Sequence, residues 1–244
     1  MENFDFIFAR RRQLLIRALG AAAGIALPLS LRAQAILGGT PGPLPPGRAF
    51  YRITGDVTVN GQIATLETPV HPGDTVTTGD SSEAIFVVGS QSLLLRERSR
   101  VELESAAAPV NSAALFIAGL RITGKLLSVS RDVGQRLTTP TATIGIRGTG
   151  WYAESDPDLT YFCTCYGEAD MVSNEDPASR ETVVSKRHDR PLYIAREGPE
   201  GGRIRDAPFI NHTDQELMLI EALVGRAPPF VFPSDNYRSP QRRY

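Results

Sequence analysis

Hydrophobic and polar residues alternate along most of the chain from residue 49 onward, and this alternation predicts β-strands. In "GDVTVNGQIATL", Val57 and Val59 take alternate positions ahead of Asn60-Gly61, a dipeptide typical of a tight hairpin turn. The segments "SSEAIFVVGSQSLLL", "SAALFIAGLRITGKLLSVS" and "RPLYIAR" repeat the pattern, with turn residues between them. Strands that recur about every 8 to 12 residues are typical of all-β domains.

A segment near the C-terminus has helical periodicity instead. Thr213 and Glu216 have the spacing of a capping box, in which each side chain accepts a hydrogen bond from the backbone N–H of the other residue. Apolar residues of one helical face follow at Leu217, Ile220 and Val224. Gly225 stands where helices commonly end, and Pro228-Pro229 prevent continuation. We expect this helix to pack on the sheet through its apolar face.

The N-terminal residues have the pattern of an export signal. The paired Arg11-Arg12 precede an apolar run rich in Ala, Leu and Gly, and Ala33-Gln34-Ala35 forms a small-x-small cleavage site. Twin arginines in this position fit the twin-arginine export pattern; ordinary secretion and an uncleaved N-terminal anchor are the alternatives. We therefore expect a mature chain that begins near Ile36, is periplasmic or secreted, and has no transmembrane anchor.

These patterns predict an all-β fold class, either a sandwich or a solenoid-like double-layered sheet, with one C-terminal helix. Turn spacing alone does not distinguish the sandwich from the solenoid. The expected order along the chain is a twin-arginine signal peptide (1–35), a Gly/Pro-rich linker (36–48), a β domain with a C-terminal extension (49–210), the helix (211–226) and a mobile tail (227–244).

The charge balance bears on the partner class. The formal net charge is −1, from 26 Lys and Arg against 27 Asp and Glu. Removal of residues 1–35 takes away five arginines and two acids, which changes the formal charge to −4. A chain with no basic excess does not match the pattern of nucleic-acid-binding domains, so we expect no nucleic-acid partner.

Three segments carry a family resemblance: "GDVTVNG", "VHPGDTVTTGDSSEAIFVVGSQSLLL" and "RLTTPTATIGIRGTGWYA". In order and spacing they resemble the FecR domain family over about residues 55–153, which implies an extracytoplasmic all-β module. Signalling FecR proteins resemble transmembrane regulators whose cytoplasmic segment binds a sigma factor. Arg11-Arg12 stand too close to residue 1 for such a segment, so we expect a free-standing exported FecR-like protein.

The most specific of these segments contains Arg147, Gly148 and Thr149, which we predict to be structural or ligand-contacting residues. Gly148 and Gly150 permit a β-bulge or a positive φ. Arg147 offers five donors in a rigid fork. Two roles are open for it: holding backbone carbonyls or a nearby acid in place, or binding an anion.

Both cysteines, Cys163 and Cys165, fall in one predicted strand, with side chains on the same face. Three interpretations are open. They are small apolar residues of a buried face, or a local or redox-active disulfide, or two ligands of a metal site completed by His188 or His212. Their Cα atoms would lie nearly 7 Å apart in an extended strand, at the limit for a disulfide.

The histidines and acids of the sequence form no known catalytic motif, and we expect a non-catalytic protein without a cofactor. His71 and His188 are expected in turns, that of His188 solvated among charged neighbours, and His212 beside the helix cap. The favoured function is an exported binding or interaction module of the cell envelope, with a protein or envelope glycan as partner. The alternative is a metal-binding or redox-linked periplasmic protein that uses Cys163 and Cys165.

Overall fold

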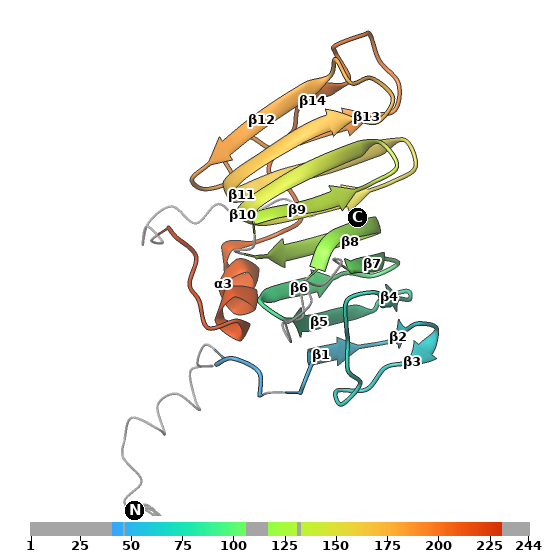
Figure 1. The fold of residues 1–244 in the computed structure, drawn as a ribbon, viewed down its shortest axis with the longest axis vertical. Coiled ribbons are helices and arrows are strands. Elements are labelled where there is room, and N and C mark those ends of the chain that lie inside the picture. The colour runs from blue at the N-terminus through green and yellow to red at the C-terminus, as the bar shows by residue number, and fades with distance from the viewer. Residues whose placement is uncertain (1–40, 46, 106–116, 131–132, 231–244) are drawn as a thin grey trace, which may run out of the picture. The chain divides into compact units, whose positions relative to one another are not determined.

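A computed structural model of the protein describes residues 41–45, 47–105, 117–130 and 133–230 (Figure 1). Over these ranges the chain forms fourteen β-strands and one α-helix near the C-terminus, which confirms the predicted all-β class. The predicted signal peptide and most of the predicted tail lie outside the described residues. Within them, no helix has the length and apolar character needed to cross a membrane.

The strands vary from two to fifteen residues in length. In chain order the elements are β1 (Phe50–Thr54), β2 (Val57–Val59), β3 (Gln62–Ile63), β4 (Thr75–Thr78), β5 (Glu83–Val88), β6 (Gln91–Leu95), β7 (Arg100–Ser105), β8 (Ile117–Val129), β9 (Val133–Thr138), β10 (Ala142–Ser155), β11 (Leu159–Ser173), β12 (Arg180–Ser185), β13 (Leu192–Ala195), β14 (Ile204–Asp206) and α3 (Asp214–Leu223).

Three long strands, β8, β10 and β11, each take part in two layers of sheet. In β10, Trp151 pairs with Ser128 of β8, whereas Thr143 pairs with Thr138 of β9. The first layer contains β1, β5, β6, β13 and β14, and the second contains β2, β3, β4, β7, β9 and β12; the three long strands continue from one layer into the other. This is the double-layered arrangement expected from the sequence.

The main hydrophobic core lies between the two layers. Its largest fully buried members from the first layer are Phe50, Phe86, Leu93, Leu95, Trp151 and Phe162, and from the second layer Leu103, Leu120 and Ile122. The outer face of the first layer is apolar as well, because Ile85, Leu94 and Leu127 point away from this core into a second cluster. Strands buried on both faces lose strict alternation, which explains the continuous runs "SLLL" and "KLLSV".

Two adjacent bulges interrupt the pairing of β10 with β11. Gly148 and Thr149 together face Gly167, and Cys165 is an extra residue on β11. The bulge expected at Gly148 is therefore present, and the backbone φ of Gly148 is 59°. Gly150 is required beside it, because a Cβ at this position would collide with the ring of Tyr166. As a result the alternation of β11 changes phase at Cys165.

The helix α3 covers the outer face of the first layer, beside β6 and β8 (Figure 1). Its predicted capping box is confirmed: Thr213 is the N-cap, and its hydroxyl accepts from the backbone N–H of Glu216. Leu217, Ile220 and Leu223 are buried against the sheet and form part of the second cluster.

The carboxylate of Asp176 holds the turn between β11 and β12 in place through hydrogen bonds. It accepts from Ser179 Oγ at 2.7 Å and from the backbone N–H groups of Gly201 at 2.7 Å and Ala178 at 3.1 Å. These bonds, led by that of Ser179, lower the pKa of Asp176. Because folding lowers the pKa of this carboxyl group, its ionised form stabilises the folded state at pH values above the ordinary carboxyl pKa. This stabilisation is lost as the pH falls through the folded-state pKa.

We therefore expect Asp176→Asn to lower the urea unfolding midpoint at pH 7 and to have a progressively smaller effect below pH 4. Asp80→Asn is the matched control, because the side chain of Asp80 is 88% exposed. A midpoint difference for Asp176→Asn that does not change with pH would contradict this role.

Candidate metal centre

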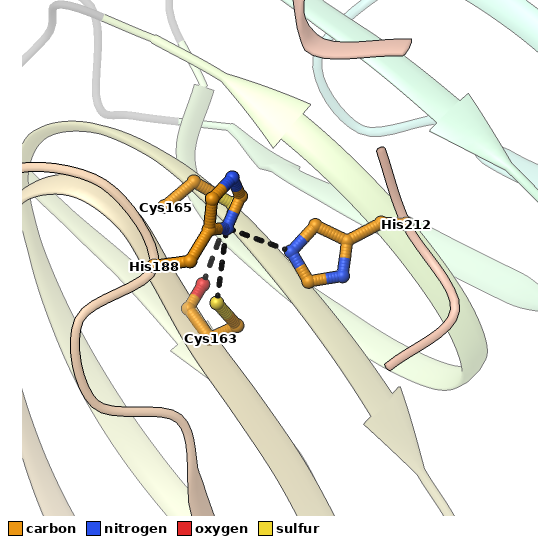
Figure 2. Close-up of side chains that lie close together, drawn as sticks. All are labelled: Cys163, Cys165, His188 and His212. Atoms are coloured by element: carbon orange, nitrogen blue, oxygen red, sulfur yellow. Dashed lines mark hydrogen bonds between the residues drawn. The ribbon is translucent and has the colours of Figure 1, made fainter. Parts of the chain in front are cut away.

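Four potential metal ligands meet on the outer face of the first layer. They are Cys163 and Cys165 of β11, His188 of the loop between β12 and β13, and His212, which directly precedes the N-cap of α3 (Figure 2). One ligand atom from each residue lies within 4.8 Å of all the others. The structure therefore brings together all the cysteines and histidines proposed from the sequence, although they come from three separate segments.

Local contacts hold each histidine in place. The backbone N–H of His188 donates to the carbonyl of Cys165 at 2.9 Å, so its loop folds back over β11. The ring of His188 packs on that of Phe209, with centroids 4.4 Å apart. The ring of His212 stacks on Tyr152 at 4.5 Å. The side chain of His188 is only 7% exposed, so the solvated turn expected from its charged neighbours is wrong.

Hydrogen bonds outside the cluster determine which ring nitrogens carry protons. His188 Nε2 lies 2.9 Å from Asp214 Oδ1, and His212 Nδ1 lies 2.7 Å from the carbonyl oxygen of Ile210. Carbonyl and carboxylate oxygens only accept, so both of these nitrogens donate. In neutral rings, the lone pairs of His188 Nδ1 and His212 Nε2 then remain, and these atoms are 3.2 Å apart. Two lone pairs at this distance repel unless a cation, either a proton or a metal ion, lies between them.

Two of the separations between ligand atoms are close to those of a tetrahedral zinc site. Zinc–nitrogen bonds of about 2.0–2.1 Å and a zinc–sulfur bond of about 2.3 Å place two ligand nitrogens about 3.3 Å apart and a nitrogen and a sulfur about 3.6 Å apart. The corresponding separations are 3.2 Å between the two histidine nitrogens and 3.4 Å between His188 Nδ1 and Cys163 Sγ.

The electrostatics of the cluster favour a thiolate at one cysteine. Burial opposes ionisation of Cys163, but the hydrogen bond from Cys165 and the nearby His212 and His188 outweigh it and lower the pKa of Cys163 well below its ordinary value. Burial and the neighbouring Cys163 raise the pKa of Cys165. A bound metal ion would favour the thiolate at both positions, since a coordinating thiol loses its proton.

The imidazole of His188 favours a positive charge when no metal is bound. Burial lowers its pKa, but the hydrogen bonds to Asp214 and Cys163 outweigh burial and raise it to about 9. The same lone pairs can thus be balanced in two ways. One is a proton between His188 and Cys163, and the other is a metal ion bound by all four ligands.

Cys163, His188 and Asp214 also lie in the order of a nucleophile, a base and an orienting carboxylate. Both thiols, however, have no exposed surface. A nucleophile must reach a carbon atom of its substrate, and a sulfur enclosed between a sheet and a covering segment cannot do so. The arrangement suits an enclosed ion better than a substrate.

The residues of the bulge are separate from this cluster. Arg147 lies on the outer face of the second layer, where it pairs with Glu168 at 3.1 Å and Asp170 at 2.7 Å. Its side chain is 56% exposed, and exposed pairs of this kind stabilise a protein by about 0–1 kcal/mol. Gly148 forms the bulge, and Thr149 is fully buried beside it. His71 is also remote from the cluster and lies 3.7 Å from Asp74.

Sequence reasoning missed Asp214, whose carboxylate orients His188 and accepts from Arg187 Nη2 at 2.5 Å. Asp214 is visible in "HTDQE" as an acid in the first turn of a helix, where the usual interpretation is a favourable interaction with the helix dipole. The sequence does not show that this carboxylate meets His188, which is 26 residues away along the chain.

The state of the cysteines can be measured directly. We expect two free thiols per chain after unfolding in guanidinium with a chelator, and none that reacts with a disulfide reagent within minutes in the native protein, because both sulfurs are buried. An unfolded chain without free thiols would mean a Cys163–Cys165 disulfide and would exclude a two-thiolate metal site.

Comparisons with known proteins find solved structures that are similar to part of this chain. Two crystal structures of a candidate anti-sigma factor from Parabacteroides distasonis align with this chain at 12% and 13% sequence identity, with TM-scores of 0.41 and 0.42. Each alignment covers 67% of this chain, and 82% or 81% of the other chain. No family model and no curated protein matches the sequence.

Proposed function

We propose that this protein is an exported, non-catalytic β-domain protein that binds one zinc ion through Cys163, Cys165, His188 and His212. The observation that carries the proposal is the pair of ring nitrogens 3.2 Å apart whose lone pairs face each other, with two thiols beside them. Four enclosed side-chain donors of this kind are the ligand set of a structural metal site.

The donor types favour zinc over other common ions. Two thiolates and two imidazoles in a tetrahedral arrangement suit Zn²⁺, whereas Mg²⁺ and Ca²⁺ require oxygen ligands. The proposed site has four protein ligands and leaves no open position for water, which distinguishes it from catalytic zinc sites with three. The carboxylate of Asp214 and the carbonyl of Ile210 act as the outer hydrogen-bond partners that metal-bound histidines need.

The thiol count after unfolding distinguishes the metal site from the disulfide alternative. The structure holds Cys163 and Cys165 as free thiols beside the two histidines. Metal coordination would keep these thiols reduced in an oxidising compartment.

Export belongs to the same proposal and is supported by the Arg11-Arg12 pattern and the cleavage site at Ala33-Gln34-Ala35. Twin-arginine substrates cross the membrane folded, so a buried metal ion would be acquired before export. The outer face of the second layer carries the charged side chains of Arg121, Arg147 and Glu168 and stays available for a protein or envelope-glycan partner.

The proposal is tested by metal analysis of the full chain purified from its own export compartment. We expect one zinc ion per chain, and thiolate-to-cobalt charge-transfer absorption after replacement of zinc with Co²⁺. Cys163→Ser and His188→Ala should each lower the zinc affinity at least tenfold, since each removes a ligand. His71→Ala is the matched control, because it removes the histidine outside the cluster and should leave the affinity unchanged.

A wild-type protein that retains no zinc and shows no cobalt–thiolate absorption after incubation with Co²⁺ would refute the proposal. Both measurements use the wild-type chain, so the result does not depend on whether the variants fold.

A further inference from the structure

We infer that the proposed metal ion fastens the C-terminal segment, residues 207–226, to the sheet, so that metal binding and docking of α3 are thermodynamically coupled. This inference rests on the proposed metal site and adds a regulatory role to it. The metal site then has a structural consequence beyond its own ligands: it controls how firmly one face of the first layer is covered.

The ligands are divided between two parts of the chain. Cys163 and Cys165 belong to β11, and the backbone of His188 is hydrogen-bonded to β11 through the carbonyl of Cys165. These three ligands stay on the sheet if the C-terminal segment leaves it. His212 belongs to the segment, so a metal ion bound to all four side chains joins the segment to the sheet.

A second contact makes the segment part of the site. Asp214 is the first residue of α3, and its Oδ1 accepts from His188 Nε2 at 2.9 Å. The segment therefore supplies one ligand directly and also orients a ligand that belongs to the sheet side. Loss of an outer hydrogen-bond partner of this kind commonly weakens metal binding about 10- to 100-fold. Undocking of α3 removes both contributions together.

The helix α3 is short, so an additional link to the sheet changes how firmly it docks. It spans ten residues, and helices this short are marginal without packing. Other polar contacts also hold the segment: Arg96 pairs with Glu216 at 2.9 Å, and Asn211 donates to Glu154 at 2.6 Å. These contacts do not involve the metal ligands, so the segment can still dock without metal, but less firmly.

The apolar surface under the segment shows what undocking would expose. The sheet side of the second cluster contains Ile85, Leu94, Leu127, Val129, Tyr152 and Tyr161. All are at most 2% exposed while the segment is docked. An apolar sheet face of this kind favours either redocking of the segment or association with another apolar surface.

Thermodynamic reciprocity makes the inference quantitative. A ligand shifts a conformational equilibrium only by the ratio of its affinities for the two states. Here that ratio compares zinc held by four side chains, with His188 oriented by Asp214, with zinc held by the three ligands on the sheet alone. The factor by which zinc stabilises the docked segment must therefore be at least as large as the factor by which His212→Ala weakens zinc binding.

The experiment is hydrogen–deuterium exchange of the full-length chain, with saturating Zn²⁺ and after chelation. Peptides from α3 should exchange about 5- to 150-fold more slowly with zinc, the usual range of coupling between sites, while peptides from β10 stay protected in both samples. Zinc affinity is measured in parallel by competition with a chelator, for the wild type and for His212→Ala.

Two variants separate the metal contact from ordinary packing. In His212→Ala, zinc should bind more weakly and the exchange of α3 should lose most of its dependence on zinc, with the contact between Asp214 and His188 as the remaining link. Leu217→Ala, in which a fully buried side chain of α3 is truncated, should speed exchange of α3 in both samples and keep the dependence on zinc. Asp214→Asn should weaken the dependence without abolishing it.

Exchange of α3 that is unchanged by zinc, in a wild-type protein that demonstrably binds zinc, would overturn the inference and leave the metal site standing. Equal loss of protection in β10 and α3 after chelation would also overturn it, because the metal would then support the whole fold. Absence of zinc binding in the wild type would refute the proposed function itself.

Discussion

The candidate metal centre is built around one interaction, the close approach of His188 Nδ1 and His212 Nε2 at 3.2 Å. Each ring donates its other N–H outward, to Asp214 and to the carbonyl of Ile210. The two facing nitrogens therefore have lone pairs to share with a cation, and two sulfurs lie beside them. A buried polar group without a partner is costly, so either a proton or a metal ion beside these nitrogens would stabilise the arrangement. A proton satisfies one pair of atoms, whereas a zinc ion satisfies all four.

The fold provides this position through two features of the sheet. The first layer is apolar on both faces, so its outer face needs a cover, and the C-terminal segment with α3 supplies it. The bulge at Cys165 shifts the phase of β11, so that Cys163, Cys165 and Tyr166 all belong to the covered face. The glycine-rich "TIGIRGTG" has an architectural part in this, because Gly148 and Gly150 permit the bulges opposite the cysteines.

Local features of the fold were predictable from the sequence, and long-range ones were not. The capping box of Thr213 and Glu216 follows from residue spacing alone, because both partners lie in one helical turn. Alternation indicated a double-layered sheet, but which strands lie in each layer depends on how β8, β10 and β11 pair with distant strands, which alternation does not encode. For the same reason, the sequence left open whether the two cysteines meet His188 or His212 in a metal site, and only the long-range pairing of the strands brings all four together. The charged neighbours of His188 indicated solvent, whereas packing against Phe209 and Asp214 buries it.

The most direct test of the metal centre is X-ray absorption spectroscopy at the zinc edge of the metal-loaded protein. We expect a four-coordinate shell with two sulfur atoms at about 2.3 Å and two imidazole nitrogens at about 2.0–2.1 Å. A shell made only of oxygen and nitrogen atoms would contradict this expectation, because zinc would then be bound away from Cys163 and Cys165.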